Sequence, residues 1–320
     1  MKTGAEHIKG AGAFPTRFLS VADLDHCQLL ECLQLAAQMK VARACRRPHE
    51  RPLEGLHVAL LFEKPSLRTR STFEIAVREL GGDVIEPPQD VALGGRETIA
   101  DVARNLERWV TAAVVRTFAQ ARIREFADAA PRLGVVNALT NEEHPCQALA
   151  DCLTLMERWG SLHGRTIAFV GDGNNVAASL AQAATMLGAR VRIVSPPGFE
   201  VSAAVQSSIG KLARSGGTLE LTSDPSAGVA GADAVYTDVW TSMGQEDEAT
   251  DRHAAFRPYQ VNSAMMARAS AGALFMHCLP AHRGEEVTDD VIDSNVSTVF
   301  DQAENRLHAQ KALLALLSRS

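Results

Sequence analysis

The chain has 320 residues, a formal net charge of −6, 46% hydrophobic residues and 22% charged residues. This length can bury two hydrophobic cores, so we expect about two domains of a globular protein. The negative charge balance argues against a general attraction to nucleic acid or to an anionic membrane surface, so any anion site must be local.

The cysteines and the N-terminal segment bear on the compartment. Six cysteines occur without a CxxC pair, which argues against a disulfide framework or a cysteine zinc site and favours reduced thiols. The first residues carry no apolar segment typical of a signal peptide, and no apolar run reaches about 18 residues. We therefore expect a cytoplasmic protein that does not insert into a membrane.

The first third of the chain alternates helices and strands. Residues 1–16 are expected to be loose, and apolar residues at helical spacing predict a helix over residues 24–44. Residues 56–62 predict a buried strand, after which Ser66 begins a helix that ends at Gly81. The inner face of that helix is predicted to carry Phe73, Ala76, Val77 and Leu80.

The next segment continues the alternation. A short strand is predicted at residues 83–86 and a buried strand ends at Arg116, followed by another at residues 135–139. Between the first two, a helix begins near Thr98. Its inward residues are predicted to be Ile99, Val102, Leu106 and Trp109.

The second half repeats the pattern. His144 precedes a helix with Pro145 in its first turn, and Gly160 closes that helix. Residues 166–195 read as strand, glycine-rich turn, helix and strand. Short apolar strands are predicted within residues 219–224, 233–240, 273–280 and 297–302, and a last helix is predicted from about Ala303.

This alternation indicates βαβ units with parallel sheets, in which ligands gather at the carboxyl ends of the strands. Ser66, Arg68 and Arg116 fall at such ends, as do Asp238 and Cys278. Guanidinium and hydroxyl groups at a helix start form an anion site, typically for phosphate. A capped surface helix with solvated arginines remains the alternative for residues 66–70.

The other polar motifs also have two interpretations. Residues 171–175, GDGNN, resemble a dinucleotide loop, but Val176 replaces its third glycine and no acid ends the next strand, which disfavours a nicotinamide cofactor. Asn174 and Asn175 could be turn residues or ligand contacts. His144 could cap a helix or polarise a carbonyl, and Asp238 could cap a loop or bind an ammonium. Cys278 could be a small buried apolar residue, or a site residue because it lies at a ligand-side strand end.

Seven motifs together resemble the aspartate/ornithine carbamoyltransferase family. In chain order they are SLRTR (66–70), VRTF (115–118), HPCQ (144–147), GDGNN (171–175), DVWTSMG (238–244), HCLP (277–280) and ENR (304–306). They span nearly the whole chain, and DVWTSMG is similar to the ornithine-binding loop of the family. The resemblance implies an α/β fold of two Rossmann-like domains, each with a central parallel sheet, joined by bridging helices.

The resemblance also implies domain roles. Residues 1–145 would form the carbamoyl-phosphate-binding domain, with the helix at about residues 303–320 packed on it, and residues 146–302 would bind ornithine. The implied partners are carbamoyl phosphate and L-ornithine, in a homotrimer with sites at subunit interfaces. No metal, no organic cofactor, no nucleic acid and no membrane are implied.

The site residues implied by the resemblance fall into three groups. The catalytic residues are Arg116, His144, Asp238 and Cys278. Carbamoyl phosphate would be bound by Ser66, Leu67, Arg68, Thr69, Arg116, His144, Gln147, Cys278, Leu279 and Arg306. Ornithine would be bound by Asn175, Asp238, Ser242 and Met243.

The implied reaction moves a carbamoyl group to the δ-amine of L-ornithine, giving L-citrulline and phosphate, within arginine biosynthesis or other arginine and ornithine metabolism. Arg116, His144 and Thr69 would stabilise the carbonyl oxygen as it gains charge. Carbamoyl phosphate is expected to bind before ornithine. Residues 241–251 are expected to form a lid over the bound substrates.

Two departures and three alternatives stay open. Leu67 replaces the usual threonine of the Ser-Thr-Arg-Thr-Arg motif, and Ala92 stands where many relatives place a glutamine that reaches the neighbouring subunit. The alternatives are transfer to another amine such as putrescine or an N-acylated ornithine, a non-catalytic paralogue, and a nicotinamide oxidoreductase.

Overall fold

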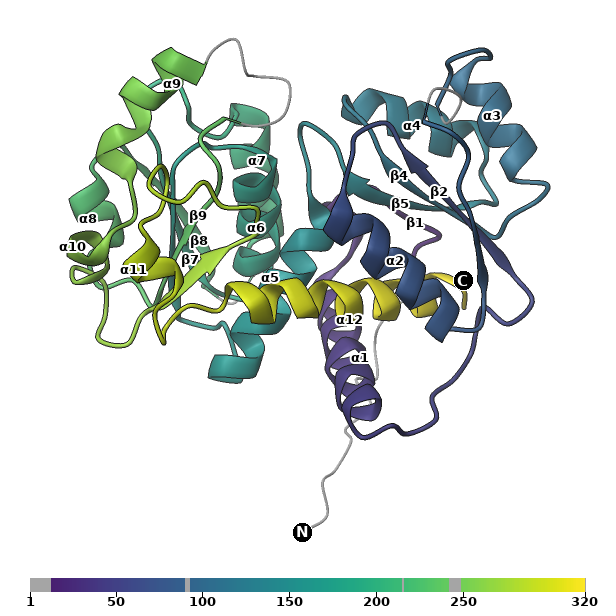
Figure 1. Cartoon of the computed structure of the whole chain (residues 1–320), viewed down its shortest axis with the longest axis horizontal. Coiled ribbons are helices and arrows are strands. Elements are labelled where there is room, and N and C mark those ends of the chain that lie inside the picture. The colour runs from purple at the N-terminus through teal and green to yellow at the C-terminus, as the bar shows by residue number, and fades with distance from the viewer. Residues whose placement is uncertain (1–12, 90–92, 215, 242–248, 320) are drawn as a thin grey trace. The chain divides into compact units, whose positions relative to one another are not determined.

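The structure is a computed structural model that describes residues 13–89, 93–214, 216–241 and 249–319. The chain divides into two compact units (Figure 1). The first contains Met1–Ala138 and Leu307–Ser320, and the second contains Leu139–Arg306. No helix within the described residues is both long and apolar enough to cross a membrane.

Each unit is built on a five-stranded sheet. The first sheet has the strand order β1-β5-β4-β2-β3, and the second has the order β10-β9-β6-β7-β8. The strands of the first sheet are β1 (Arg17–Phe18), β2 (His57–Phe62), β3 (Asp83–Ile85), β4 (Ala112–Arg116) and β5 (Gly134–Leu139). Those of the second are β6 (Thr166–Val170), β7 (Arg190–Val194), β8 (Thr218–Thr222), β9 (Ala234–Thr237) and β10 (Leu274–His277).

Parallel pairing holds in both sheets. In the first, β1 pairs with β5, and β2 pairs with β3 and β4. All four pairs of the second sheet are parallel. The predicted α/β class with parallel sheets is therefore confirmed. Because both faces of such sheets must be covered, the central strands β2, β4, β6 and β9 are buried nearly throughout.

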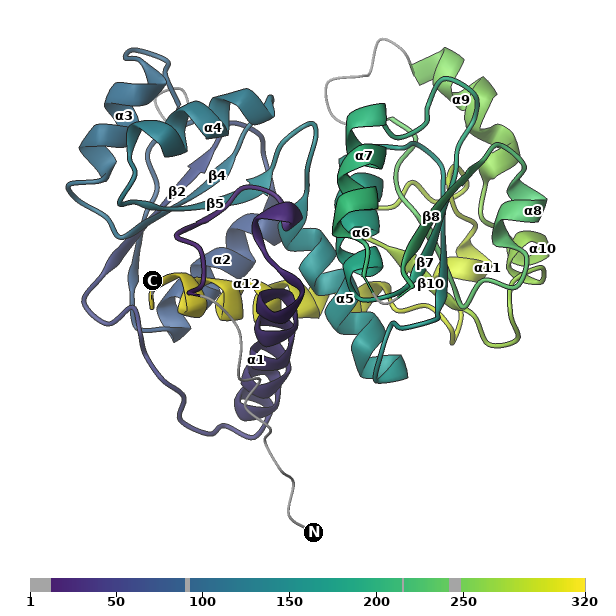
Figure 2. The same cartoon turned by 180° about the vertical axis from the view of Figure 1, so that it is seen from behind.

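Helices cover both faces of each sheet (Figures 1 and 2). The longer helices are α1 (His26–Ala44), α2 (Leu67–Glu79), α3 (Ile99–Leu106), α4 (Gln120–Ala129), α5 (Pro145–Trp159), α6 (Asn175–Met186), α7 (Ala203–Leu212), α9 (Ala249–Phe256) and α12 (Val299–Leu317). The shorter ones are α8 (Pro225–Val229), α10 (Ser263–Met266), α11 (Asp289–Ile292) and the 3-10 turns Val21–Asp23 and Arg257–Tyr259.

In the first unit, α3 and α4 pack on one face of the sheet through Ile99, Leu106, Ile123 and Phe126, and α2 lies on the opposite face (Figure 1). In the second unit, α8, α10 and α11 share one apolar cluster with β6, β9 and β10, and α6 and α7 lie on the other face (Figures 1 and 2).

Local sequence signals place most helix ends correctly. Ser66 and Thr98 are the N-caps of α2 and α3, and each side chain accepts a hydrogen bond from the backbone N–H three residues on. Gly81 follows the end of α2 with φ +91°, a backbone conformation that glycine adopts without strain. The predicted inner face of α2 is buried.

Two predictions are wrong. Trp109 is 67% exposed, because α3 ends at Leu106 and a turn then takes Trp109 out of the helical register. Residues 297–302 do not form a strand, since Val299 already begins α12. Thr298 instead anchors the start of that helix through a hydroxyl hydrogen bond of 3.0 Å to the Phe275 carbonyl.

The core assignment of the first unit gives a first test. Phe126 is fully buried among α3, α4 and the sheet, so Phe126→Ala should lower the free energy of unfolding by about 3–5 kcal/mol. Trp109→Ala, in the same unit but exposed, should change it by less than about 0.5 kcal/mol. Urea unfolding followed by circular dichroism measures both. Equal losses in the two variants would contradict the packing described here.

Candidate active site

The second sheet brings its carboxyl ends into one row. Val170 is paired with Val194 and Thr237, and Thr237 is paired with His277. These residues are the last of their strands, so the residues that follow them emerge at one edge. The sheet register therefore brings together the loop after Val170, Asp238 and Cys278, as the motif positions predicted.

Asp238 lies at the centre of this row and is nearly buried, with 7% exposed. Its Oδ2 accepts a hydrogen bond of 2.8 Å from Asn174 Nδ2, and its Oδ1 accepts one of 3.0 Å from Cys278 Sγ. Both carboxylate oxygens are thus oriented by neighbouring strand ends. Such a fixed anion is suited to hold an ammonium group.

Cys278 acts here as a hydrogen-bond donor. Burial, and then the neighbouring Asp238 carboxylate, raise the pKa of the Cys278 thiol well above its usual value. The thiolate is the nucleophilic form, so a thiol in this environment is unsuited to covalent catalysis. The geometry instead gives Cys278 the role of orienting Asp238.

The glycine-rich turn after β6 has a structural explanation. A Cβ at Gly173 would lie 2.4 Å from the Val201 backbone nitrogen, so only glycine fits. Asn174 caps α6 by accepting from the N–H groups of Val176 and Ala177. Asn175 Nδ2 donates 2.6 Å to the Thr140 carbonyl. Close packing at Gly173 and helix capping by Asn174 therefore explain the residues of this turn.

The backbone after Cys278 is held from inside the unit. Leu279 has φ +58° and donates its N–H to His277 Nδ1 at 2.9 Å. Because Nδ1 accepts, the other ring nitrogen of a neutral His277 carries the proton and faces Glu286 Oε1 at 3.2 Å. Both His277 and Glu286 are fully buried. This pair fixes the main chain of Cys278 and Leu279.

His144 is the N-cap residue of α5 and is 5% exposed. Its backbone N–H donates 2.9 Å to Ser179 Oγ. Ser179 donates in turn to Glu143, whose other carboxylate oxygen accepts from Gln182 Nε2 at 2.9 Å. A buried carboxylate with two donors thus anchors the mouth of α5 to α6.

Gln147, one turn into α5, is oriented by two partners. Its Nε2 donates 2.8 Å to Asp151 Oδ1, which leaves Oε1 to accept from Arg306 Nη1. Asp151 also accepts from Gln302 Nε2 at 2.9 Å and from the Tyr236 hydroxyl at 3.1 Å. Burial raises the pKa of Asp151 from 3.8 to about 6, because these donors only partly replace water.

In the first unit, Ser66, Leu67, Arg68 and Thr69 form the N-terminal turn of α2. Thr69 is buried, whereas the Leu67 side chain is 79% exposed. The first N–H groups of a helix have no intrahelical acceptor, and the helix dipole makes this end positive. The turn therefore combines the backbone amides of a positive helix end with the Arg68 guanidinium.

Arg116 lies at the same edge of the first sheet. It is the last residue of β4, is paired with Phe62 at the end of β2, and is 6% exposed. Its carbonyl accepts from Glu63 N at 2.9 Å. The sequence-predicted residues of this unit thus share one strand edge, as parallel pairing requires.

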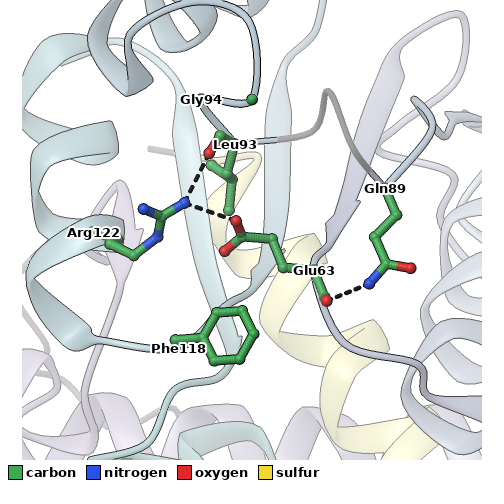
Figure 3. A pocket seen from close by; sticks show the side chains of 7 residues that line it. Glu63, Gln89, Leu93, Gly94, Phe118 and Arg122 are labelled. Atoms are coloured by element: carbon green, nitrogen blue, oxygen red, sulfur yellow. Dashed lines mark hydrogen bonds and ion pairs between the residues drawn. The ribbon is translucent and has the colours of Figure 1, made fainter.

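A pocket of about 530 Å³ lies in the first unit between the end of β2 and the segment before α3 (Figure 3). Arg122 crosses it, donating 2.7 Å to Glu63 Oε1 and 2.7 Å to the Leu93 carbonyl. Gln89 donates to the Glu63 carbonyl on the other side (Figure 3). Its lining contains none of the predicted site residues, although Phe118 belongs to the VRTF motif.

Some predicted positions lie outside the described residues: Ser242, Met243, Ala92 and most of the proposed lid. The sequence reasoning also missed Asp151, Ser179 and Glu286. For Asp151 a signal existed, because it stands four residues after Gln147 on a predicted helix and therefore on the same face. Ser179 and Glu286 carry no such local signal.

Two units, each with a parallel sheet that gathers polar side chains at the carboxyl ends of its strands, define the class of α/β proteins that bind small ligands at these ends. A family model described as the carbamoyl-P binding domain of aspartate/ornithine carbamoyltransferase matches residues 16–157. A second, the Asp/Orn binding domain of the same family, matches residues 163–317. The chain belongs to the aspartate/ornithine carbamoyltransferase family.

The similar proteins agree. An ornithine carbamoyltransferase from Parafrankia sp. is 49% identical over 302 residues, which cover 94% of this chain and 95% of the relative. The one from Pyrococcus horikoshii is 48% identical over 301 residues, covering 93% and 94%. The solved ornithine carbamoyltransferase of Pyrococcus furiosus has a TM-score of 0.90 and 47% identity, with 96% of this chain and 97% of that chain covered.

The raised pKa of Asp151 predicts a pH dependence of stability. Between pH about 4 and about 6 the folded state binds this proton and the unfolded state does not, so Asp151 stabilises the fold less as pH rises. The unfolding free energy of wild type relative to Asp151→Asn should fall by up to about 3 kcal/mol across that window. Denaturant titrations at several pH values measure it. A difference that does not change with pH would contradict the burial of this charge.

Proposed function

We propose that this protein transfers the carbamoyl group of carbamoyl phosphate to the δ-amine of L-ornithine. The observation that carries the proposal is the Asp238 carboxylate, fixed by Asn174 and Cys278 at the carboxyl edge of the second sheet. An anion there is suited to the α-ammonium of an amino acid. Membership of a family whose two domains both match supports the same conclusion.

The first unit is proposed to hold the phosphate end of carbamoyl phosphate. Ser66, Leu67, Arg68 and Thr69 offer backbone amides, a hydroxyl and a guanidinium at the start of α2. The exposed Leu67 side chain leaves its main-chain amide as the useful group. Arg116 adds positive charge at the same edge and stabilises the carbonyl oxygen during transfer.

In the second unit, further residues are proposed to contact substrate. Gln147 and Arg306 form an oriented pair, and His144 stands at the helix mouth. The backbone of Cys278 and Leu279 is held by His277 and Glu286. Asn175 is proposed to contact ornithine together with Asp238, and the family motif adds Ser242 and Met243.

The chemistry is a direct substitution. The δ-nitrogen forms a bond to the carbamoyl carbon, the bond from that carbon to the phosphate oxygen breaks, and the nitrogen loses a proton. The products are citrulline and phosphate. Only about one alkylamine in 10³ is neutral at pH 7, so the site must favour the free amine. The protonated state of Cys278 is consistent with a reaction without a covalent enzyme intermediate.

We also propose that the reaction serves arginine biosynthesis or another part of arginine metabolism, that it takes place in the cytoplasm, and that the protein works as a homotrimer. The last rests on the family resemblance alone. Sedimentation at enzyme concentrations tests it, and a monomer that is fully active would refute it.

The activity is tested by incubating the protein with carbamoyl phosphate and a panel of amines: L-ornithine, putrescine and N-acetylornithine. Citrulline should form, and the other two amines should react far more slowly, because only ornithine carries both a free α-ammonium and a carboxylate. Equal rates with putrescine would favour the alternative carbamoyltransferase. No product with any amine, despite carbamoyl-phosphate binding, would favour a non-catalytic paralogue.

Arg68→Ala tests the phosphate site. Losing a charge-assisted contact of about 1.5–3 kcal/mol should weaken carbamoyl-phosphate binding by roughly 10–100-fold. Arg78→Ala is the matched control on the same helix, because Arg78 lies in the last turn, is exposed and pairs with Glu74. Calorimetric titration measures both. Unchanged affinity in Arg68→Ala rules out its proposed role.

Asp238→Asn tests the amino-acid site separately. The variant keeps the shape but loses the negative charge, so the KM for ornithine should rise by roughly tenfold or more, while carbamoyl-phosphate affinity stays near wild type. Asp128→Asn, an exposed carboxylate of the first unit, should leave both unchanged. A wild-type ornithine KM in Asp238→Asn would remove Asp238 from the proposal.

A further inference from the structure

Three polar side chains of the first unit close a ring of hydrogen bonds. Glu63 follows directly after β2, and its Oε1 accepts 2.7 Å from Arg122 Nη2 (Figure 3). Its Oε2 accepts from the hydroxyl of Thr117, the residue after β4. Arg122 Nε in turn donates 3.2 Å to Thr117 Oγ1. Each of the three side chains therefore contacts the other two.

The same residues also bind the backbone of neighbouring segments. Glu63 N donates 2.9 Å to the Arg116 carbonyl, which joins the end of β2 to the end of β4. Arg122 Nη2 donates 2.7 Å to the Leu93 carbonyl, and Gln89 Nε2 donates to the Glu63 carbonyl (Figure 3). Glu63 and Arg122 thus connect β2, β4 and the segment before α3.

Two of these segments carry proposed contacts of carbamoyl phosphate. Ser66, the N-cap of α2, lies three residues after Glu63, and Arg116 directly precedes Thr117. A displacement of Glu63 against Thr117 would therefore shift Ser66 relative to Arg116. The ring of hydrogen bonds fixes the spacing on which a ligand held by both segments depends.

The charges of the ring indicate how it would act on such a ligand. One carboxylate and one guanidinium cancel, so the pair of Glu63 and Arg122 adds no net charge to an anion site. The Glu63 side chain is 15% exposed and that of Arg122 is 35% exposed, so the pair is partly shielded from water. Its expected effect is on the position of neighbouring groups and not on the attraction of phosphate.

The guanidinium of Arg122 suits this role better than another cation would. It donates to Glu63, Thr117 and Leu93, which belong to three different segments. A guanidinium presents its donors in a rigid planar fork, whereas the ammonium of lysine is a compact charge on a flexible stem. Charge alone would therefore not reproduce the three contacts.

We propose that Glu63, Thr117 and Arg122 form a clamp that positions the carbamoyl-phosphate contacts of the first unit. The clamp holds the start of α2 against the end of β4, so that Ser66 and Arg116 meet the ligand in a fixed arrangement. The three residues act through these contacts and are positioning residues. The inference rests on the proposed function for the identity of the ligand, but the effect on the protein's own backbone can be measured without it.

Hydrogen exchange of the ligand-free full chain tests the clamp directly. Glu63→Gln keeps the shape of the side chain but loses its charge, so amides of residues 66–70 and 116–118 should exchange roughly tenfold faster. Thr117→Val should do the same, whereas Thr117→Ser retains the hydroxyl and should match wild type. Arg124→Ala removes an exposed arginine two residues further along α4 and is the matched control.

Calorimetric titration and steady-state assays test the consequence for the ligand. In Glu63→Gln and Arg122→Ala, the affinity for carbamoyl phosphate and kcat should each fall by roughly 10–100-fold, because Ser66 and Arg116 are no longer held in place. The KM for ornithine should stay near the wild-type value. Arg122→Lys keeps the charge without the guanidinium fork, so it should not restore the affinity.

Three results would overturn the clamp. One is unchanged exchange at residues 66–70 and 116–118 in both Glu63→Gln and Thr117→Val. Another is wild-type carbamoyl-phosphate affinity in Arg122→Lys, because charge alone would then suffice. The third is equally faster exchange in β5, which would show loosening of the whole unit. A wild-type protein that binds no carbamoyl phosphate would instead refute the proposed function, and faster exchange confined to the two segments would still support the clamp.

Discussion

Parallel strand pairing is the constraint on which the candidate site depends. Because neighbouring strands run in one direction and are paired in register, Val170, Thr237 and His277 end together. Everything that follows them is delivered to one edge of the second sheet. The pairing of Phe62 with Arg116 does the same for the first sheet. The sheet alone therefore brings together candidate site residues that lie far apart in the sequence.

Buried carboxylates then orient the side chains that the sheet delivers. Asp151 sets the amide of Gln147, and Glu143 holds the mouth of α5 through Ser179. Glu286 orients the His277 ring, and His277 in turn accepts a hydrogen bond from the backbone N–H of Leu279. Burying a carboxylate costs free energy unless hydrogen-bond donors replace the lost water. Removing one donor would leave that cost uncompensated, so the donors are held in fixed positions. The polar interior therefore contributes order to the site as well as stability.

The sequence predicted those features that depend on neighbouring residues alone, such as helix caps and strand ends. Ser66 and Thr98 begin helices because their hydroxyls cap them. Asp238 and Cys278 follow directly after strands β9 and β10, within the segments that the sequence predicted as strands. Contacts that form only on tertiary folding could not be predicted. No sequence pattern around Glu286 indicates that it contacts His277, and β1 is too short to show an alternating hydrophobic pattern. The strand predicted at residues 297–302 failed for a related reason. A short apolar run suits a strand or a helix start, and here the contact of Thr298 with Phe275 decides.

Hydrogen exchange followed by mass spectrometry tests most directly whether the two strand edges carry separate parts of the chemistry. Carbamoyl phosphate alone should slow amide exchange at the start of α2, residues 66–70. A non-reactive ornithine analogue, added to the carbamoyl-phosphate-loaded protein, should slow exchange around Asn174 and Asp238. Protection around Asp238 by carbamoyl phosphate with none at residues 66–70, or no protection by either ligand, would contradict this account.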